Sequence, residues 1–300
     1  MVHIFLLDPY VGGDMDSEHL REVLGQMQDL EYYIITLTSD WYQTDYIKRI
    51  QEIFDEDDIR FYVCGSLETL NHTINCIDDL QAVEIAYIPA FPSDSFMKVF
   101  GEKASFFHDY DRMISGKAIP MDYIRTNHGK ALNVFSVGYT LGFHSTSFVY
   151  RHKDRDVHII RGFLILLRMM LGREMDMKVE ADGYSEQLKA DTVFFGNGCC
   201  HASMLYYEKH PSLVDGRGTL CIHRKAGMIG AIRQYIHLRR KNYDLQKKDA
   251  TSFLSCDVSL HSEEPVMGYV DEMPICTDQD WEIHMVRQGM QFVLPRGVSL

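Results

Sequence analysis

The first hundred residues alternate short apolar runs with segments in which apolar residues recur at helical spacing. Buried strands are predicted for four runs: HIFLL (3–7), EYYIITL (31–37), RFYVCG (60–65) and AVEIAYIPAF (82–91). Helices are predicted for three segments between them: SEHLREVLGQMQDL (17–30), TDYIKRIQEIF (44–54) and LNHTINCIDDL (70–80). Strands that alternate with helices predict βαβ units and a parallel sheet.

The pattern changes after about residue 120. Short strand-like runs follow one another, separated by turns rich in Gly, Asn and Asp, with two further helices predicted over 157–172 and 226–242. This pattern is typical of a β-rich domain. The predicted fold class is therefore an α/β N-terminal domain with a parallel sheet over 1–118, followed by a β-rich domain over 119–300, which the family resemblance described below makes a β-sandwich-like substrate domain.

Charge and cysteine content narrow the classes of function. The chain has 30 Lys and Arg against 43 Asp and Glu, a formal charge of −13, which disfavours a nucleic-acid-binding surface because nucleic acids are polyanions. Seven scattered cysteines without a CxxC pair indicate reduced thiols. The N-terminus lacks a basic signal region, and GFLILLRMMLG (162–172) is too short for a bilayer span. We expect a cytoplasmic protein that could contact only the inner face of a membrane.

Three loops follow the carboxyl ends of predicted strands, where parallel sheets bind ligands: DPYVGG (8–13), CGSLET (64–69) and PAFPSDS (89–95). The stretch VCGSLETLNHTINCI (63–77) runs from a strand through a small-residue turn into a helix, an arrangement that often holds phosphate. It has one glycine, however, and the acidic Glu68 stands where backbone amides would face an anion.

These loops resemble the motifs of the bacterial diacylglycerol kinase and lipid kinase family, relatives of the sphingosine kinases and, more distantly, of the NAD kinases. The family pattern GGDGT followed by LNEVVNGI aligns without gaps on GSLETLNHTINCI, and P-x-GTGNDFARALG aligns on PAFPSDSFMKVFG (89–101). The family's first loop, NPxxG, is similar to the segment of this chain that contains Asp8, Pro9 and Gly12. The positions that match in the other two motifs are Gly65, Thr69, Leu70, Asn71, Asn75, Pro89, Phe96 and Gly101.

The resemblance extends in consistent order over nearly the whole chain. It implies an α/β nucleotide domain followed by a β-sandwich domain, with the last ~10–15 residues packing back on the first domain. It also implies a transferase of phospholipid metabolism that uses ATP and Mg²⁺ to phosphorylate a lipid hydroxyl. A homodimer is one assembly that such a protein could form. The residues that would hold ATP are Asp8, Pro9, Gly65, Ser66, Glu68, Thr69, Ser93, Asp94 and Ser95.

Two later segments bear on the acceptor and on metal. The family's DGE segment, which supplies a general base, aligns on Val270, Asp271 and Glu272, so Glu272, with Asp271 beside it, is the predicted catalytic residue. In relatives a DDG segment supports a metal site. This chain retains the last two residues of that segment, Asp215 and Gly216, so Asp215 is the predicted metal residue.

The nucleotide motifs also depart from the family pattern. Leu67 replaces the aspartate of GGDGT and can bind neither a metal-bound water nor a donor, while Glu68 replaces its third glycine. A carboxylate about 4 Å from a phosphate charge costs roughly 1 kcal/mol in water and about 4 kcal/mol at an effective dielectric near 20. Alternatively, Glu68 lies in solvent at a helix start, where acids are favoured. Phe91 and Pro92 replace a glycine and a threonine of the second motif.

Asp8, Glu68 and Asp94 are three acids that could converge where ATP phosphates would bind. Either the pocket has lost nucleotide binding, or the acids hold a divalent metal that recovers the phosphates. We therefore predict a diacylglycerol kinase-like protein whose ATP-dependent phosphoryl transfer to a lipid hydroxyl is impaired. The alternative is a non-catalytic relative, a pseudokinase that binds a lipid or a protein partner.

One stretch, 224–248, is basic in an otherwise acidic chain, with eight Lys or Arg and one acid. Within it, apolar residues recur at helical spacing: Met228, Ile229, Ile232, Tyr235 and Ile236. A basic amphipathic stretch can dock on an anionic lipid surface. The other interpretation is a helix packed on the domain, with a solvated basic end.

Overall fold

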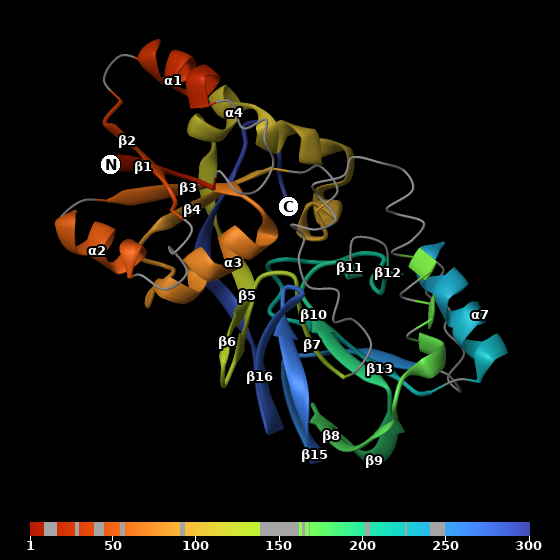
Figure 1. Ribbon diagram of the computed structural model, residues 1–300. Coiled ribbons are helices and arrows are strands. Elements are labelled where there is room, and N and C mark those ends of the chain that lie inside the picture. The colour runs from red at the N-terminus through yellow and green to blue at the C-terminus, as the bar shows by residue number, and fades with distance from the viewer. Residues whose placement is uncertain are drawn as a thin grey trace. The chain divides into compact units, whose positions relative to one another are not determined.

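The architecture is that of a computed structural model (Figure 1). It describes residues 1–8, 17–27, 30–38, 45–54, 58–90, 94–138, 162–163, 166–167, 169–201, 205–225, 227–240 and 250–300. The described residues form two compact units, the first made of residues 1–121 and 288–300 and the second of residues from 122 to 287. The C-terminal residues thus belong to the first unit.

The first unit contains a parallel sheet in the order β2-β1-β3-β4, extended by residues 291–292 of the last strand, which pair in parallel with β4. Its strands are β1 (Val2–Leu7), β2 (Tyr32–Thr36), β3 (Ile59–Gly65) and β4 (Glu84–Pro89). Every residue of β1 and β3 is buried, as expected for strands of a sheet covered on both faces.

Helices lie on both faces of this sheet, with α1 and α4 on one side and α2 and α3 on the other (Figure 1). The helices are α1 (Ser17–Gly25), α2 (Tyr46–Ile53), α3 (Leu67–Cys76), the 3₁₀ segment η2 (Phe96–His108) and α4 (Tyr110–Ile114). The predicted α/β domain with a parallel sheet is confirmed. Helix α3 begins three residues earlier than predicted because Ser66 caps it.

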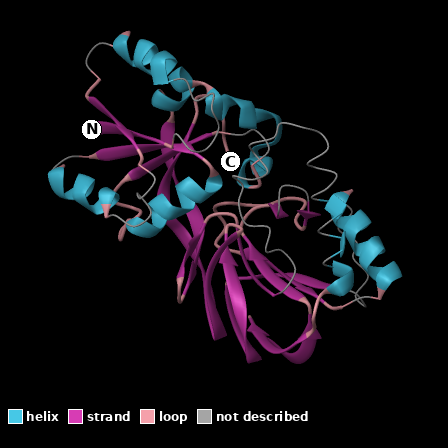
Figure 2. Cartoon of the chain, viewed as in Figure 1, coloured by secondary structure: helices cyan, strands magenta, loops and turns pink. Residues whose placement is uncertain are grey.

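The second unit is built mainly of antiparallel strands (Figure 2). Their order is β14-β13-β10-β7-β15-β16, and β8 and β9 continue from the first half of β15. The strands are β5 (Lys117–Thr126), β6 (Gly129–Ala131), β7 (Val134–Gly138), β8 (Met175–Ala181), β9 (Tyr184–Ala190), β10 (Thr192–Gly196), β13 (Gly218–His223), β14 (Ala250–Ser255), β15 (Asp257–Val270) and β16 (Met273–Leu294). The predicted β-rich second part is confirmed.

The core of the second unit lies under these strands and includes the fully buried rings of Phe135, Phe195 and Trp281. A short hairpin, β11 (Cys200–His201) and β12 (Leu205–Tyr206), and helix α7 (Met228–Arg239) complete the unit. Of the helix predicted over 157–172, residues 157–161 lie outside the described residues, and 162–163, 166–167 and 169–171 are helical. Among the described helices, none has the length and apolar character required to cross a bilayer.

Candidate functional site

The three predicted loops of the first unit start at the same edge of its sheet. In the register of the sheet, Leu7 lies opposite Cys64, and Gly65 lies opposite Pro89. Backbone bonds continue past the strand ends, because the amide of Asp8 donates to the carbonyl of Cys64 (3.0 Å) and that of Ala90 to the carbonyl of Gly65 (2.7 Å). The site residues predicted at Pro9 and Ser93 lie outside the described residues.

Ser66 and Thr69 form a reciprocal cap at the start of α3. The amide of Thr69 donates to the Ser66 hydroxyl, and the amide of Ser66 donates to the Thr69 hydroxyl, both over 3.2 Å. Such a capping box satisfies two amides that a helix start would otherwise leave for another acceptor. Two of the donors expected to face a phosphate are therefore used within the loop.

Asp8 takes part in the same network. The Thr69 hydroxyl donates to Oδ2 of Asp8 over 2.6 Å, and the Asp8 side chain is almost completely buried. Leu67, at the position of the family aspartate, is also buried. Glu68 is half-buried in the first turn of α3, where the helix dipole favours an acid.

Asp94 is held by a residue that sequence reasoning missed. The hydroxyl of Tyr87, in β4, donates to Oδ2 of Asp94 over 2.5 Å, and the amide of Phe96 donates to Oδ1 over 2.8 Å. Asp94 and Ser95 are both buried. The carboxylate therefore shapes the turn into η2. A tyrosine inside an otherwise aliphatic strand was the available signal, because a buried phenol usually bonds a partner.

Gly65 touches the cap directly. A Cβ built at this position would lie 2.7 Å from the Thr69 hydroxyl oxygen.

Cys64, beside Gly65, is fully buried, and burial raises the pKa of its thiol, so this cysteine is an unreactive packing residue. The described residues include all seven cysteines of the chain, and none of the seven forms a disulfide.

The alternative in which acids hold a divalent metal finds no support among the described residues. Within them, no group of three or more His, Cys, Asp or Glu side chains is arranged to hold a metal ion. Asp8 and Asp94 instead accept hydrogen bonds from Thr69 and Tyr87.

In the second unit, Asp271 and Glu272 form the two-residue turn between β15 and β16. Both have positive φ, 48° and 73°, as in a type I′ hairpin turn. The buried carboxylate of Asp271 accepts three backbone amides, from Leu132 (2.8 Å), Asn133 (2.8 Å) and Val134 (3.0 Å). Asp271 therefore anchors the turn, and Glu272, which is half-buried, is held beside it.

Asp122 is a further buried acid that sequence reasoning missed, although an acid within the apolar run MDYI was a signal. Its Oδ2 accepts the amide of Gly216 over 2.6 Å, and Asn197 donates to its backbone carbonyl over 3.0 Å. The predicted metal residue, Asp215, accepts the amide of Arg217 (3.0 Å) and lines a hollow of about 70 Å³ with Asn197. These contacts order the segment around Asp215.

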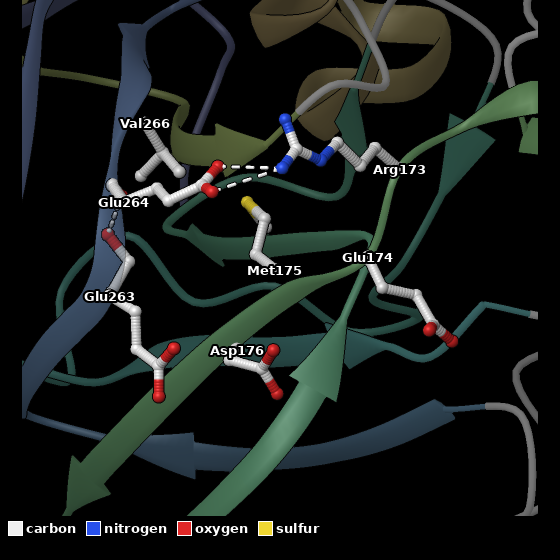
Figure 3. Close-up of a pocket in the computed structure, with 8 residues that line it drawn as sticks. Arg173, Glu174, Met175, Asp176, Glu263, Glu264 and Val266 are labelled. Atoms are coloured by element: carbon white, nitrogen blue, oxygen red, sulfur yellow. Dashed lines mark hydrogen bonds and ion pairs between the residues drawn. The ribbon is translucent and has the colours of Figure 1, made fainter.

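A second hollow of about 70 Å³ lies apart from all predicted site residues (Figure 3). Arg173 reaches across it to Glu264, with N–O distances of 3.1 and 2.9 Å. The other acids on its wall are Glu174, Asp176 and Glu263. An exposed pair of this kind contributes little to stability.

Comparison with solved structures identifies the fold of the chain. A diacylglycerol kinase from Bacillus anthracis strain Sterne superposes with a TM-score of 0.72 at 15% identity, covering 99% of this chain and 98% of that one. A structure from the same strain, provisionally assigned to the same activity, gives 0.76 at 16% identity with the same coverage. The chain has the diacylglycerol kinase fold.

This fold also relates the chain to a more distant neighbour. An NAD kinase from Archaeoglobus fulgidus, solved in complex with ATP, superposes with a TM-score of 0.50 at 8% identity over 99% of this chain and 94% of that one. No protein-family model and no curated protein matches the sequence. The resemblance noted from the motifs is thus supported at the level of the diacylglycerol kinase fold.

Proposed function

We propose that the chain is a diacylglycerol kinase-like protein in which ATP-dependent phosphoryl transfer to a lipid hydroxyl is impaired, so that it acts as a non-catalytic lipid-binding relative. The observation that carries this proposal is the closed network at the start of α3. There the amides of Ser66 and Thr69 bond to each other's hydroxyls, and the Thr69 hydroxyl donates to Asp8.

Phosphoryl transfer needs the opposite arrangement. The transferring group is stabilised by backbone amides, cations and metal-held carboxylates that point at the phosphates. Here a buried leucine stands at the position of the family aspartate, and Asp94 is bound by Tyr87 and by the amide of Phe96. The residues present therefore fit Mg-ATP poorly, although an NAD kinase of related fold was solved with ATP.

Thermal unfolding during a titration with Mg-ATP tests the proposal. A ligand at one hundred times its Kd stabilises a protein by about 2.7 kcal/mol, so micromolar binding would raise the Tm clearly at millimolar nucleotide. We expect no saturable rise. A saturable, magnesium-dependent rise with micromolar affinity would overturn the proposal, and ATP with EDTA provides the control.

The second candidate is an active lipid kinase in which Glu272 is the general base. What favours it is the position of Glu272, which is half-buried in the β15–β16 turn at the position where the resemblance places a general base. A phosphorylation assay with diacylglycerol in mixed micelles would compare the wild type, Glu272→Gln and the exposed control Glu263→Gln. Turnover that is lost only in Glu272→Gln would establish this candidate.

A further inference from the structure

The outward face of the β15–β16 hairpin pairs each of its histidines with a carboxylate on the opposite strand. Asp257 in β15 lies opposite His284 in β16, and Nδ1 of the histidine is 2.7 Å from the Asp257 carboxylate. Further along β15, His261 lies opposite Asp280, with Nδ1 2.6 Å from the carboxylate. These side chains are 42–69% exposed and share one face of the hairpin, because residues at even spacing in a strand point to the same side.

A third pair joins the hairpin to the neighbouring β5–β6 turn. Nε2 of His128 in that turn lies 2.6 Å from Oδ2 of Asp278 in β16, and the imidazole packs edge-on against the ring of Trp281. The hydrogen bond with His128 lowers the pKa of Asp278, which favours the charged carboxylate. We call the three pairs the histidine ladder: His284–Asp257, His261–Asp280 and His128–Asp278.

The histidine ladder lies on both sides of an irregularity in the hairpin. Regular pairing of β15 with β16 ends at His261, opposite Asp280, and resumes at Val266, opposite Asp278. A bulge of this kind interrupts the backbone hydrogen bonds between two strands, which leaves more of the register to side-chain contacts. One pair of the ladder therefore stands immediately before the bulge, and the pair of Asp278 with His128 stands immediately after it.

The ion pairs on the neighbouring strand β8 are of another kind. Lys178 lies opposite His261 but pairs with Glu180 over 2.9 Å. Lys189 of β9 lies 3.8 Å from Asp176. Lysine keeps its charge between pH 8 and pH 6, whereas histidine titrates in this range. The ladder thus has a dependence on pH that the lysine pairs beside it lack.

The other charged groups around the ladder keep their charge between pH 8 and pH 6. They are Glu282, which accepts the Ser259 hydroxyl between the two hairpin pairs, Arg125 and Lys130 on β5 and β6, Glu263, Glu264 and Arg173 at the bulge, and Asp182, Asp215 and Arg217 near Cys256. The thiols of Cys256 and Cys276 stay neutral in this range, because desolvation raises the pKa of each. The charge of this face therefore changes at its three histidines.

We infer that the histidine ladder is a pH-sensitive lock, which holds the β15–β16 hairpin more firmly as the pH falls from 8 to 6. A neutral imidazole forms an ordinary hydrogen bond with a carboxylate, whereas a protonated one forms an ion pair with a charge-assisted hydrogen bond. Because the pairs exist only in the folded chain, the added stabilisation is present below the histidine range and is lost as the pH rises through it. The lock goes beyond the proposed function, since it requires neither nucleotide nor lipid.

The lock bears on the candidate site because the same hairpin ends in the turn of Asp271 and Glu272. Strands open locally as contiguous units, so an opening that begins at the bulge would carry the turn with it. We expect the lock to reach the amide of Asp271, which donates to the carbonyl of Val134 over 2.8 Å.

Amide hydrogen exchange of the full chain at pH 8 and pH 6 tests the inference, with rates corrected for the intrinsic effect of pH. The test variant is Asp257→Asn with Asp280→Asn, in which asparagine retains an acceptor oxygen but cannot form an ion pair. The matched control is Asp176→Asn with Glu180→Gln, which removes two carboxylates whose partners are lysines. Both double variants change the net charge by the same amount.

We compare the protection of the wild type with that of each variant over 257–261 and 280–284. From pH 8 to pH 6 the ratio of wild type to test variant should rise about 2- to 20-fold, because an exposed ion pair shifts the opening equilibrium by about 1.4- to 5-fold. The ratio should rise likewise at the amide of Asp271 and stay constant for the control. The effect of the buried His223 cancels in these ratios, because all three proteins contain it. In 1 M sodium chloride most of the rise should disappear, since exposed pairs are screened.

Equal ratios at the two pH values overturn the inference. An equal rise in the control does so too, because it would assign the effect to net charge, and so does a rise that salt leaves unchanged. A rise confined to the strands and absent at Asp271 overturns the reach of the lock to the turn. His261→Gln repeats the measurement if the double variant folds poorly, since glutamine can donate to Asp280 but takes up no proton. This variant should give a rise of about 1.4- to 5-fold, and a constant ratio would overturn the inference.

Discussion

Asp271 should be a residue on which the stability of the second unit depends. Its carboxylate accepts amides from Leu132, Asn133 and Val134 at 2.8, 2.8 and 3.0 Å, and only 3% of the residue is exposed. A hydrogen bond to a charged group contributes about 1.5–3 kcal/mol, and an amide left unsatisfied in the interior costs about 1–3 kcal/mol. For Asp271→Ala, with water replacing part of the lost contacts, we expect a loss of about 3–5 kcal/mol.

Asp271→Asn separates hydrogen bonding from packing. Asparagine retains one acceptor oxygen, which can serve Asn133 and Val134, but places an NH₂ group against the amide of Leu132. The expected loss is about 1–3 kcal/mol, smaller than for alanine.

Urea unfolding followed by circular dichroism measures both losses. Asp257→Asn is the control, because Asp257 pairs with His284 on the exposed face of the β15–β16 hairpin and should cost less than about 1 kcal/mol. A loss below about 1 kcal/mol for Asp271→Ala, or equal losses for alanine and asparagine, would refute the structural role argued from the three amides. If stability is kept and lipid phosphorylation is lost, Asp271 acts in catalysis instead.

Three further predictions concern other buried groups. Tyr87→Phe removes the hydroxyl that donates to a buried carboxylate and should cost about 1–3 kcal/mol in urea unfolding, whereas no change would mean that the bond is dispensable. Burial lowers the pKa of His223 from 6.5 to about 4, so the unfolded chain binds a proton that the folded chain excludes between these values, and stability falls as the pH falls from 7 to 4. In His223→Gln this pH-dependent loss should be smaller by about 2–3 kcal/mol, and parallel curves for the two proteins would contradict the assignment. Gly268→Ala would push a methyl group into the buried ring of Trp281 and should cost about 1–3 kcal/mol, checked by the shift in Tm.

The order of strands and helices could be predicted because apolar periodicity records which residues face a core. The start of α3 could not, because it depends on hydrogen bonds between Ser66 and Thr69 that periodicity does not register. For α7 the spacing grouped five apolar residues on one face. Four of them, Met228, Ile229, Ile232 and Ile236, are exposed, whereas the fifth, Tyr235, is half-buried and packs on the unit. The spacing could not indicate which side of the helix faces the unit. Only the packing of Ala231 and Leu238 shows this.

The topology of the parallel sheet allowed part of the candidate site to be predicted. Loops that follow parallel strands must meet at one edge of the sheet, so the proximity of Asp8 to Thr69 follows from topology. The hydrogen bond from Tyr87 to Asp94 joins a strand to a later turn, and the amides that hold Asp271 are more than a hundred residues away in sequence. Contacts of this kind depend on tertiary structure and leave little local pattern.

The close approach of Gly65 to Thr69 changes how the GSLET segment (65–69) should be interpreted. The glycine leaves no room for a larger residue because the capping hydroxyl occupies the space of a Cβ. Selection for folding alone would therefore retain both residues, even in a chain that never meets a nucleotide. Helix capping alone explains a glycine and a threonine in such a loop, so the two residues cannot serve as a marker of kinase activity.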